Sequence, residues 1–168
     1  YPIYCRKKGS LKAPEQILLD QNVLARGHNY FEIGKFRVSP NHHFIAYTVD
    51  TTGAESYILF IKDLNGDSLF SDRITNINYD IEWANDNKTL FYAVLDSADR
   101  PYQIFRHTLG IGSGDILLYT EDDDAYFLDI SKTRSEKYIL VSLESKTTTE
   151  VYFLCADKPH SPLTLISL

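Results

Sequence analysis

Hydrophobic residues in this chain come in short runs separated by turn-forming residues, and no stretch sustains the spacing of an amphipathic helix. The runs FIAYTV at 44–49 and YILVSL at 138–143 are continuous, as in strands that are covered on both faces. The one short helical signal is LDQNVLARG at 19–27, where Asp20 caps a single turn that Gly27 ends. The pattern therefore predicts an all-β chain.

The strand pattern recurs along the chain at a nearly constant spacing. One anchor aligns Val38, Trp83 and Ile130, with offsets of 45 and 47 residues. A second anchor aligns three positions with offsets of 45 and 48 residues: Leu59, Ile104 and Tyr152. Internal repeats of roughly 40–50 residues, each with several strands, are typical of β-propeller blades.

Each repeat is predicted to hold four strands, and the first repeat shows them most clearly. Its inner strand covers 31–38, and three further strands cover 44–49, 56–64 and 68–74. Turn residues separate the first two strands of the three repeats at 39–41, 85–87 and 131–135. Asn-Gly-Asp at 65–67 and the glycine-containing segment 110–114 predict the hairpins into the outer strands.

The repeat boundaries divide the chain into four predicted parts. Residues 1–29 hold the outer half of a preceding blade plus a linker, and one blade each occupies 30–77, 78–122 and 123–168. The fold class is therefore a partial β-propeller of about three and a half four-stranded blades. A closed four-bladed ring short of one half-blade is geometrically possible, but we favour an open arc cut from a larger ring. Because both ends of an arc expose blade faces, we expect the fragment to self-associate.

Composition narrows the functional classes. Aromatic residues make up 13% of the chain, which favours half-buried β structure. A net charge of −6 argues against nucleic-acid binding, which needs a basic face, and no apolar run is long enough to cross a membrane. The N-terminus lacks the order of a signal peptide, and Cys5 and Cys155 are predicted to be buried free thiols. These features lead us to expect a cytoplasmic protein.

Candidate catalytic and metal-binding residues do not assemble into a known site pattern. Ser113 lies in GIGSGD, which lacks the Gly-x-Ser-x-Gly elbow and a following helix, so a hairpin loop is expected. The histidines have no metal-ligand spacing, and structural or surface roles are predicted for all five: His28, His42, His43, His107 and His160. The sequence therefore predicts no catalytic residue, no cofactor site and no metal site.

Three further features have a structural and a functional interpretation. The acidic run at 121–124 could bind a cation or a basic partner, but it lacks the calcium-loop spacing, and a solvated loop between blades is favoured. Trp83 is expected in the core rather than stacked on a ligand. The basic run at 5–8 is too short to form a nucleic-acid patch.

The amino-acid sequences of several segments are similar to those of a known family. YPIYCRKKG, LLDQNVLARGH, FRVSPN, AYTVDTTGAESY and DISKTRSEKYIL follow one another in an order that resembles the propeller of the prolyl oligopeptidase family, within it the oligopeptidase B (protease II) branch. The resemblance runs almost end to end and weakens after Lys158. Ser-Pro-Asn at 39–41 replaces the usual Ser-Pro-Asp, and Asn serves the same turn.

The resemblance implies a parent enzyme in which a seven-bladed propeller caps an α/β-hydrolase domain with a Ser-Asp-His triad. Such an enzyme hydrolyses short peptides after Lys or Arg, while the cap excludes folded proteins. The implied partners are the chain's own hydrolase domain and short basic peptides. Two alternatives stay open: a stand-alone propeller that binds partner proteins, and a related exopeptidase of the same fold group.

Overall fold

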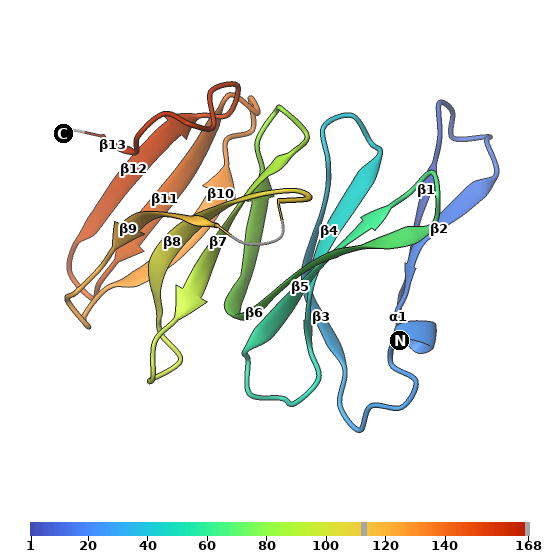
Figure 1. Cartoon of the computed structure of the whole chain (residues 1–168), viewed down its shortest axis with the longest axis horizontal. Coiled ribbons are helices and arrows are strands. Elements are labelled where there is room, and N and C mark those ends of the chain that lie inside the picture. The colour runs from blue at the N-terminus through green and yellow to red at the C-terminus, as the bar shows by residue number, and fades with distance from the viewer. Residues whose placement is uncertain (112–113, 167–168) are drawn as a thin grey trace.

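The predicted strands form stacked antiparallel sheets in the computed structural model, which describes residues 1–111 and 114–166. Within these residues there is a two-stranded sheet (β1–β2), a seven-stranded sheet (β3–β9) and a four-stranded sheet (β10–β13). Figure 1 shows them fanned side by side, in chain order from the N-terminal hairpin to the C-terminal sheet. The all-β prediction is confirmed.

The first blade contains the strands that the hydrophobic runs predict. Its members are β3 (Glu32–Val38), β4 (Phe44–Asp50), β5 (Tyr57–Asp63) and the first half of β6 (Ser68–Trp83). The Asn-Gly-Asp turn at 65–67 joins β5 to β6, with Asp67 in the left-handed region at φ +53°. The predicted strand limits of β3, β4 and β5 agree with these bounds to within one residue at each end.

The outer strand of the first blade continues without a break into the inner strand of the second. Residues 68–77 of β6 pair with β5, whereas residues 77–83 pair with β7 (Thr89–Leu95). Asn76 marks the kink between the two halves, with φ +59° and a side-chain amide that donates to the Leu95 carbonyl at 3.1 Å. The predicted boundary between residues 77 and 78 lies inside this strand.

The remaining strands complete the second and third blades. The second blade adds β8 (Pro101–Thr108) and β9 (Ile116–Thr120). The third blade consists of β10 (Phe127–Lys132), β11 (Tyr138–Glu144), β12 (Thr149–Cys155) and the two-residue β13 (Thr164–Leu165). The predicted hairpin at 110–114 includes residues 112–113, which lie outside the described residues.

The strand pairing corrects the predicted alignment of the third repeat. Lys132, not Ile130, occupies the position of Val38 and Trp83, because these residues pair with Ile139, Ile45 and Leu90. Val151, not Tyr152, matches Leu59 and Ile104. The shift arises because a separate loop at 121–126 precedes β10, whereas β6 runs straight through the corresponding point. The loop at 145–148 is then two residues shorter than the loop at 51–56, which shifts the later strands back.

The first turn of the third blade is also displaced from its predicted position at 131–135. It occupies residues 133–137, between β10 and β11. The left-handed residue of this turn is Glu136, at φ +58°, and its counterparts are His42 and Asn87, both at φ +61°. Histidine and asparagine are enriched in this conformation but glutamate is not, so the sequence signal was weakest for the turn of the third blade.

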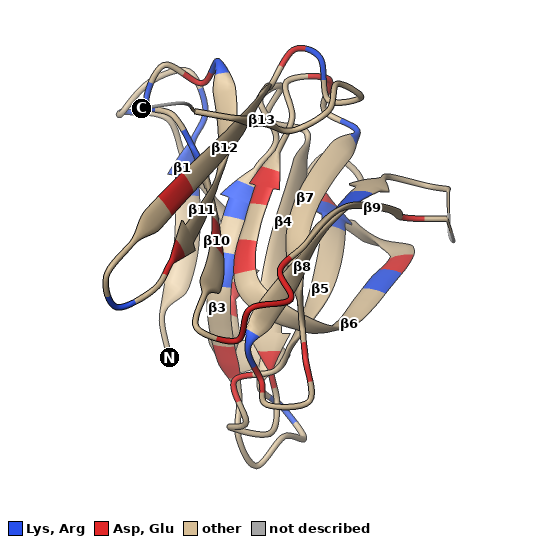
Figure 2. Cartoon of the chain, turned by 90° about the vertical axis from the view of Figure 1, so that its left-hand side faces the viewer, with Lys and Arg blue, Asp and Glu red and all other residues tan. Residues whose placement is uncertain are grey.

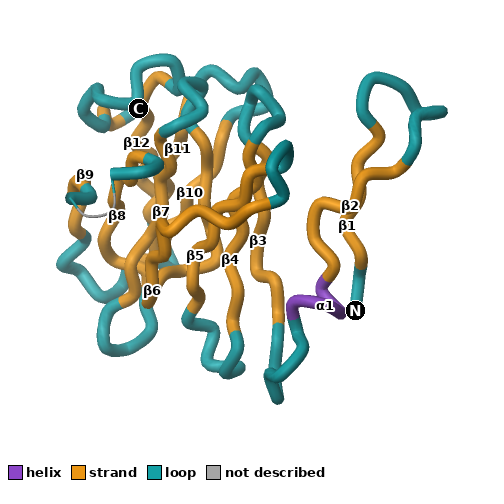
Figure 3. The backbone as a smooth tube through the Cα atoms, turned by 45° about the vertical axis from the view of Figure 1, so that its right-hand side comes forward, coloured by secondary structure: helices purple, strands orange, loops and turns teal. Residues whose placement is uncertain are grey.

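An N-terminal hairpin packs beside the first blade. It consists of β1 (Ile3–Lys7) and β2 (Glu15–Asp20), and the one-turn helix α1 (Gln21–Leu24) connects it towards β3, as Figure 3 shows. The Asp20 carboxylate accepts from the backbone amide of Asn22 at 2.9 Å, which confirms the predicted cap. The prediction that Cys5 is buried is wrong: it lies on the outward face of an edge hairpin, and Cys155 is partly buried.

The hydrophobic core lies between successive blades rather than inside any one of them. One cluster joins the hairpin to the first blade, a second contains Leu59, Ile81 and Trp83, and a third contains Ile104 and Ile130. We call the second and third contact zones the first seam and the second seam. The outward face of the third blade leaves Phe127 and Tyr138 exposed. The expected self-association of the fragment stays a prediction.

Antiparallel pairing places the connecting loops at two opposite ends of the strands. Loops 51–56, 96–100, 121–126 and 145–148 lie at one end. We call the first three of these loops the acidic rim, because together they carry seven carboxylates and one basic residue, Arg100. The turns at 39–43, 84–88 and 133–137 lie at the other end, which we call the turn end. Acidic residues gather on the loops at the lower end of the view in Figure 2.

Candidate functional site

Charged side chains on the inner strands meet across the first seam. The Lys35 ammonium of β3 contacts the Asp80 carboxylate of β6. Two residues further along both strands, Arg37 Nε donates to Glu82 Oε1 at 2.7 Å. The Asp80 and Glu82 side chains are only 3% and 7% exposed, so both anions are held away from water by their basic partners. Figure 2 shows basic and acidic segments side by side on these strands.

The same part of β6, which is the inner strand of the second blade, faces β10 of the third blade across the second seam. Counted from Trp83 and Lys132, the residues of β10 that correspond to Asp80 and Glu82 are Asp129 and Ser131. Burial, followed by the nearby Asp129 carboxyl, raises the pKa of Asp80 to about 6 despite the opposing effect of Lys35. An acid therefore meets an acid at the position where the first seam pairs an acid with a base.

A cavity of about 490 Å³ opens beside this carboxyl pair at the acidic rim. We call it the rim cavity. Its walls come from all three blades and include Glu55, Tyr79, Asp80, Asp99, Phe127 and Asp129. Gly34 allows Tyr79 to lie against Tyr57, because a Cβ at Gly34 would fall 2.5 Å from the Tyr57 ring and 2.7 Å from Tyr79 Cβ. The cavity thus combines carboxylates with aromatic rings, which is a chemistry suited to cations.

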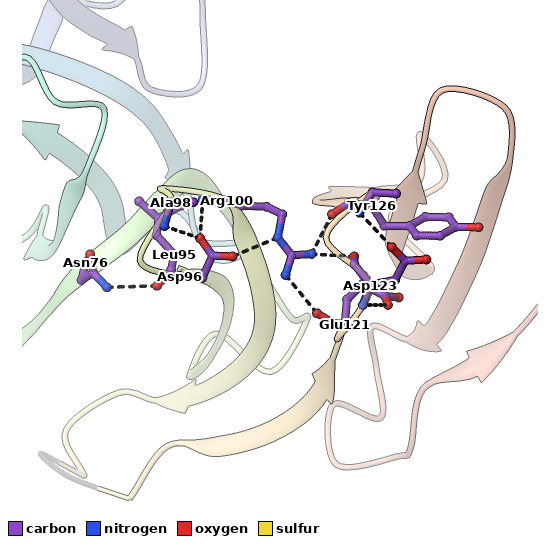
Figure 4. Close-up of polar contacts among 9 residues, drawn as sticks. Asn76, Leu95, Asp96, Ala98, Arg100, Glu121, Asp123 and Tyr126 are labelled. Carbon is purple, nitrogen blue, oxygen red and sulfur yellow. Dashed lines mark hydrogen bonds and ion pairs between the residues drawn. The ribbon is translucent and has the colours of Figure 1, made fainter.

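Arg100 organises the loops at the acidic rim. Its Nε donates to the Asp96 carboxylate at 2.9 Å, and its Nη1 donates to the carbonyls of Asp123 and Tyr126 at 2.8 and 3.0 Å. Its Nη2 donates to the Glu121 carbonyl at 3.3 Å. Figure 4 shows the guanidinium between the loop that precedes β8 and the loop that leads into β10. Because the residue is buried, these bonds hold the two loops in one arrangement.

The turn end carries a second cavity, of about 330 Å³, with a mixed lining. Arg37, Lys132 and His42 line it together with Glu82 and Glu136. Burial lowers the pKa of Lys132, whose Nζ donates to Asn85 Oδ1 at 2.6 Å. Positive and negative groups alternate here, so no single charge sign dominates the cavity.

The histidines divide into one buried and four exposed residues. His28, His42, His43 and His160 are exposed. His107 is buried between two carboxylates, with Nε2 3.1 Å from Asp72 Oδ1 and Nδ1 2.9 Å from Asp115 Oδ1. Its two ring nitrogens face opposite ways, so they serve separate partners. Across the described ranges, no three side chains of the metal-ligating types gather as a metal site would need.

The other predicted features have plain structural outcomes. The acidic run at 121–124 is a surface loop between blades, and its backbone carbonyls face Arg100. Trp83 is buried and its Nε1 donates to the Arg37 carbonyl at 2.9 Å, which confirms its core role. Ser113 lies outside the described residues. Residues 5–8 fall in and just after β1. Within the described part of the chain, no helix has the length and apolar character to span a membrane.

The sequence analysis did not predict the ion pairs between inner strands or the role of Arg100. Lys35 and Asp80, and likewise Arg37 and Glu82, are 45 residues apart, which is the offset of the first two repeats. Opposite charges at the same repeat position were therefore a usable signal for contacts between neighbouring blades. The role of Arg100 left no such signal, because the partners that it reaches in the loop before β10 are backbone carbonyls.

Similar proteins are known over the whole chain. Residues 1–168 match the family described as the prolyl oligopeptidase N-terminal β-propeller domain. "Protease 2" of Moraxella lacunata is 38% identical over 174 residues, covering 99% of this chain and 25% of that protein. "Dipeptidyl aminopeptidase BI" of Pseudoxanthomonas mexicana is 32% identical over 176 residues, covering 95% of this chain and 24% of that protein.

Solved structures agree with the sequence matches. Oligopeptidase B from Leishmania major superposes with a TM-score of 0.89 at 26% identity, covering 98% of this chain and 24% of that one. Oligopeptidase B from Trypanosoma brucei, with covalently bound antipain, gives a TM-score of 0.84 at 26% identity, covering 100% and 24%. The chain thus spans about a quarter of the length of these relatives. With its stacked four-stranded blades, the chain belongs to the prolyl oligopeptidase N-terminal β-propeller family.

Proposed function

We propose that this chain is part of the propeller of an oligopeptidase B-like serine peptidase that cleaves short peptides after Lys or Arg. The observation that carries the proposal is the end-to-end similarity to "Protease 2" and to oligopeptidase B structures. In homologues the propeller pairs with an α/β-hydrolase catalytic domain, which would supply the nucleophile and its base. The chain's own role is then to cover that domain.

The propeller would act by exclusion and orientation. A covered active site admits flexible peptides, rejects folded proteins and holds the substrate near the nucleophile, which lowers the entropic part of the barrier. The acidic rim would raise the local concentration of cationic peptides, an effect that salt weakens. We also propose a cytoplasmic location, because the two cysteines are free in the structure and reducing compartments keep thiols free.

The test is substrate turnover by the full-length parent protein. We expect cleavage of N-blocked Arg and Lys chromogenic amides and no cleavage of the matched Glu amide. A peptide with one Arg should be cleaved when free and should resist cleavage when it forms part of a folded protein. Absence of cleavage after both basic residues would contradict the proposal. The 168-residue chain alone should show no turnover.

The similarity to "Dipeptidyl aminopeptidase BI" favours one second candidate, an exopeptidase that releases dipeptides from a free N-terminus. The same assay separates the two functions when each substrate is offered with a free and with an acetylated N-terminus. An endopeptidase accepts the acetylated substrate, whereas an exopeptidase of this kind requires the free amine.

A further inference from the structure

The turn between β5 and β6 carries the chain's single Asn-Gly pair, Asn65-Gly66. In such a pair the backbone nitrogen of the glycine can approach the side-chain carbonyl carbon of the asparagine and close a five-membered ring. The other seven asparagines are each followed by a residue with a Cβ, which crowds this approach and stiffens the backbone. The sequence therefore singles out one position for this chemistry.

The structure leaves both reacting groups open. Asn65 and Gly66 are exposed, and among the hydrogen bonds of the described residues none uses the Asn65 side-chain amide or the Gly66 N–H. Four other asparagines donate their side-chain amide to a backbone carbonyl: Asn22, Asn76, Asn85 and Asn87. An amide held in this way has to give up a hydrogen bond before it reacts, and Asn65 is free of that cost.

Other atoms fix the shape of the turn. The Asn65 backbone N–H donates to Asp63 Oδ1 at 2.8 Å, and Asp67 is the left-handed residue, at φ +53°. Gly66 lies outside the left-handed region, and a Cβ on it would stand 3.3 Å from Asp63 Oδ2 and 3.5 Å from Ser68 Oγ. A carboxylate that accepts a proton and a hydroxyl that donates one therefore lie beside the residue whose nitrogen would attack.

We propose that Asn65 is a modification site, at which the chain converts a side-chain amide into a carboxylate without an enzyme. The Gly66 nitrogen forms a bond to Asn65 Cγ, the bond from Cγ to Nδ2 breaks, and Nδ2 leaves as ammonia with the proton that the Gly66 nitrogen gives up. Water then opens the cyclic imide. Hydrolysis at Cγ gives aspartate, whereas hydrolysis at the main-chain carbonyl gives isoaspartate. Water is consumed, ammonia is released, and no atom changes its oxidation state.

The new charge would arise beside an existing ion pair. Lys62 Nζ lies 2.5 Å from Asp67 Oδ1 and donates to the Leu18 carbonyl of the N-terminal hairpin at 3.4 Å. A carboxylate at position 65 adds a third acid to a turn that already holds Asp63 and Asp67. The isoaspartate form also lengthens the main chain between Asp63 and Ser68, which pair across the hairpin. The modification therefore acts on the β5–β6 hairpin and, through Lys62, on its contact with the N-terminal hairpin.

The test is a timed incubation of the 168-residue chain at pH 8 and 37 °C, followed by tryptic digestion and mass spectrometry. Peptide 63–73 contains Asn65 as its single asparagine, and the adjacent peptide 74–88 contains four others and serves as the internal control. We expect the mass increase of an amide-to-acid conversion to appear in 63–73 at least about tenfold faster than in 74–88. A zero-time sample corrects for conversion during the digest. Equal rates in the two peptides would overturn the proposal.

A synthetic peptide of residues 63–73 separates the chemistry from the fold. The folded chain should react at a rate within about tenfold of that of the free peptide, because the turn does not have to open first. A folded chain that reacts more slowly than this would show that the hairpin protects Asn65, and the proposal would be wrong.

Two variants test the roles of the two residues. Gly66→Ala fits the backbone of the turn and should slow the conversion at least about tenfold, because its Cβ crowds the attack. Asn65→Gln keeps the amide one methylene further away and should slow the conversion to a similar extent. Circular dichroism confirms that each variant is folded. Conversion of Gly66→Ala at the rate of the parent chain would contradict attack by the residue 66 nitrogen. None of these outcomes depends on the proposed peptidase function.

Discussion

The two seams between blades have the same geometry and different chemistry. In the first seam, the basic side chains of Lys35 and Arg37 meet the acidic side chains of β6. In the second seam, the equivalent strand of the third blade offers Asp129 to Asp80. Cations also join the second and third blades, but their partners are neutral: Arg100 donates to backbone carbonyls of the loop before β10, and Lys132 donates to the Asn85 amide oxygen.

The difference shows that packing and electrostatics are set separately in a propeller. Buried aliphatic side chains fill both seams, which suffices to stack the sheets. The charged positions of the inner strands differ between the blades: Lys35 and Arg37 in the first correspond to Asp129 and Ser131 in the third. One seam is closed by ion pairs, while the other keeps an acidic cavity. Three substitutions would break or sharpen this contrast.

Arg100→Ala should have the largest effect. It removes the side-chain donor to Asp96 Oδ2 and to three backbone carbonyls, so we expect a loss of about 3–5 kcal/mol in the free energy of unfolding. Urea unfolding followed by circular dichroism measures it. Arg100→Lys keeps the charge but loses the planar fork of donors. Its free energy of unfolding should therefore lie between those of the parent chain and of Arg100→Ala. A loss below about 1 kcal/mol would show that the loops at the rim hold without this residue.

Arg37→Met should have a smaller effect, because the arginine is partly exposed while its partner is not. The change leaves the buried Glu82 carboxylate in the first seam without its basic partner. We therefore expect a loss of about 2 kcal/mol in the free energy of unfolding. Fluorescence of Trp83, the chain's single tryptophan, reports unfolding at this seam. The double variant Arg37→Met with Glu82→Gln should recover part of the loss. Arg134→Met, on an exposed turn, is the control and should change stability by less than about 0.5 kcal/mol.

Asp129→Asn should have the smallest effect and the opposite sign. The raised pKa of Asp80 means that the native state holds a proton that the unfolded chain releases between about pH 4 and pH 6. Stability from this proton is present below about pH 4 and is lost as the pH rises through about 6. Removing Asp129 lowers the Asp80 pKa, so the variant should be about 1 kcal/mol more stable than the parent chain at pH 7.5.

The pH profile gives this prediction its control. The stability gain of Asp129→Asn should vanish below about pH 4, where Asp80 is protonated in both chains. Denaturant unfolding at pH 3.8, 5, 6 and 7.5 traces it. A gain that stays constant across these values would show that Asp129 acts through something other than the charge of Asp80.

Much of the local structure was accessible from the residues alone. Asp20 caps one helical turn, the Asn-Gly-Asp turn closes a hairpin, and Trp83 is in the core, all as the pattern predicts. The third repeat was misaligned by two residues at Ile130 and by one at Tyr152. Differences in loop length caused both errors. The register of each strand depends on the length of the loop before it, and the hydrophobic pattern does not show how many residues of a loop stay unpaired.

The sequence by itself determined the strands, the turns and the spacing of the blades, since these follow from local hydrophobicity and turn chemistry. Only the tertiary structure decided which charges meet at the rim. Asp80 faces Lys35 on one side and Asp129 on the other because three sheets stack around one axis. Residues 45 or 49 positions apart have no local means of selecting each other, so the rim cavity exists only once the blades have packed.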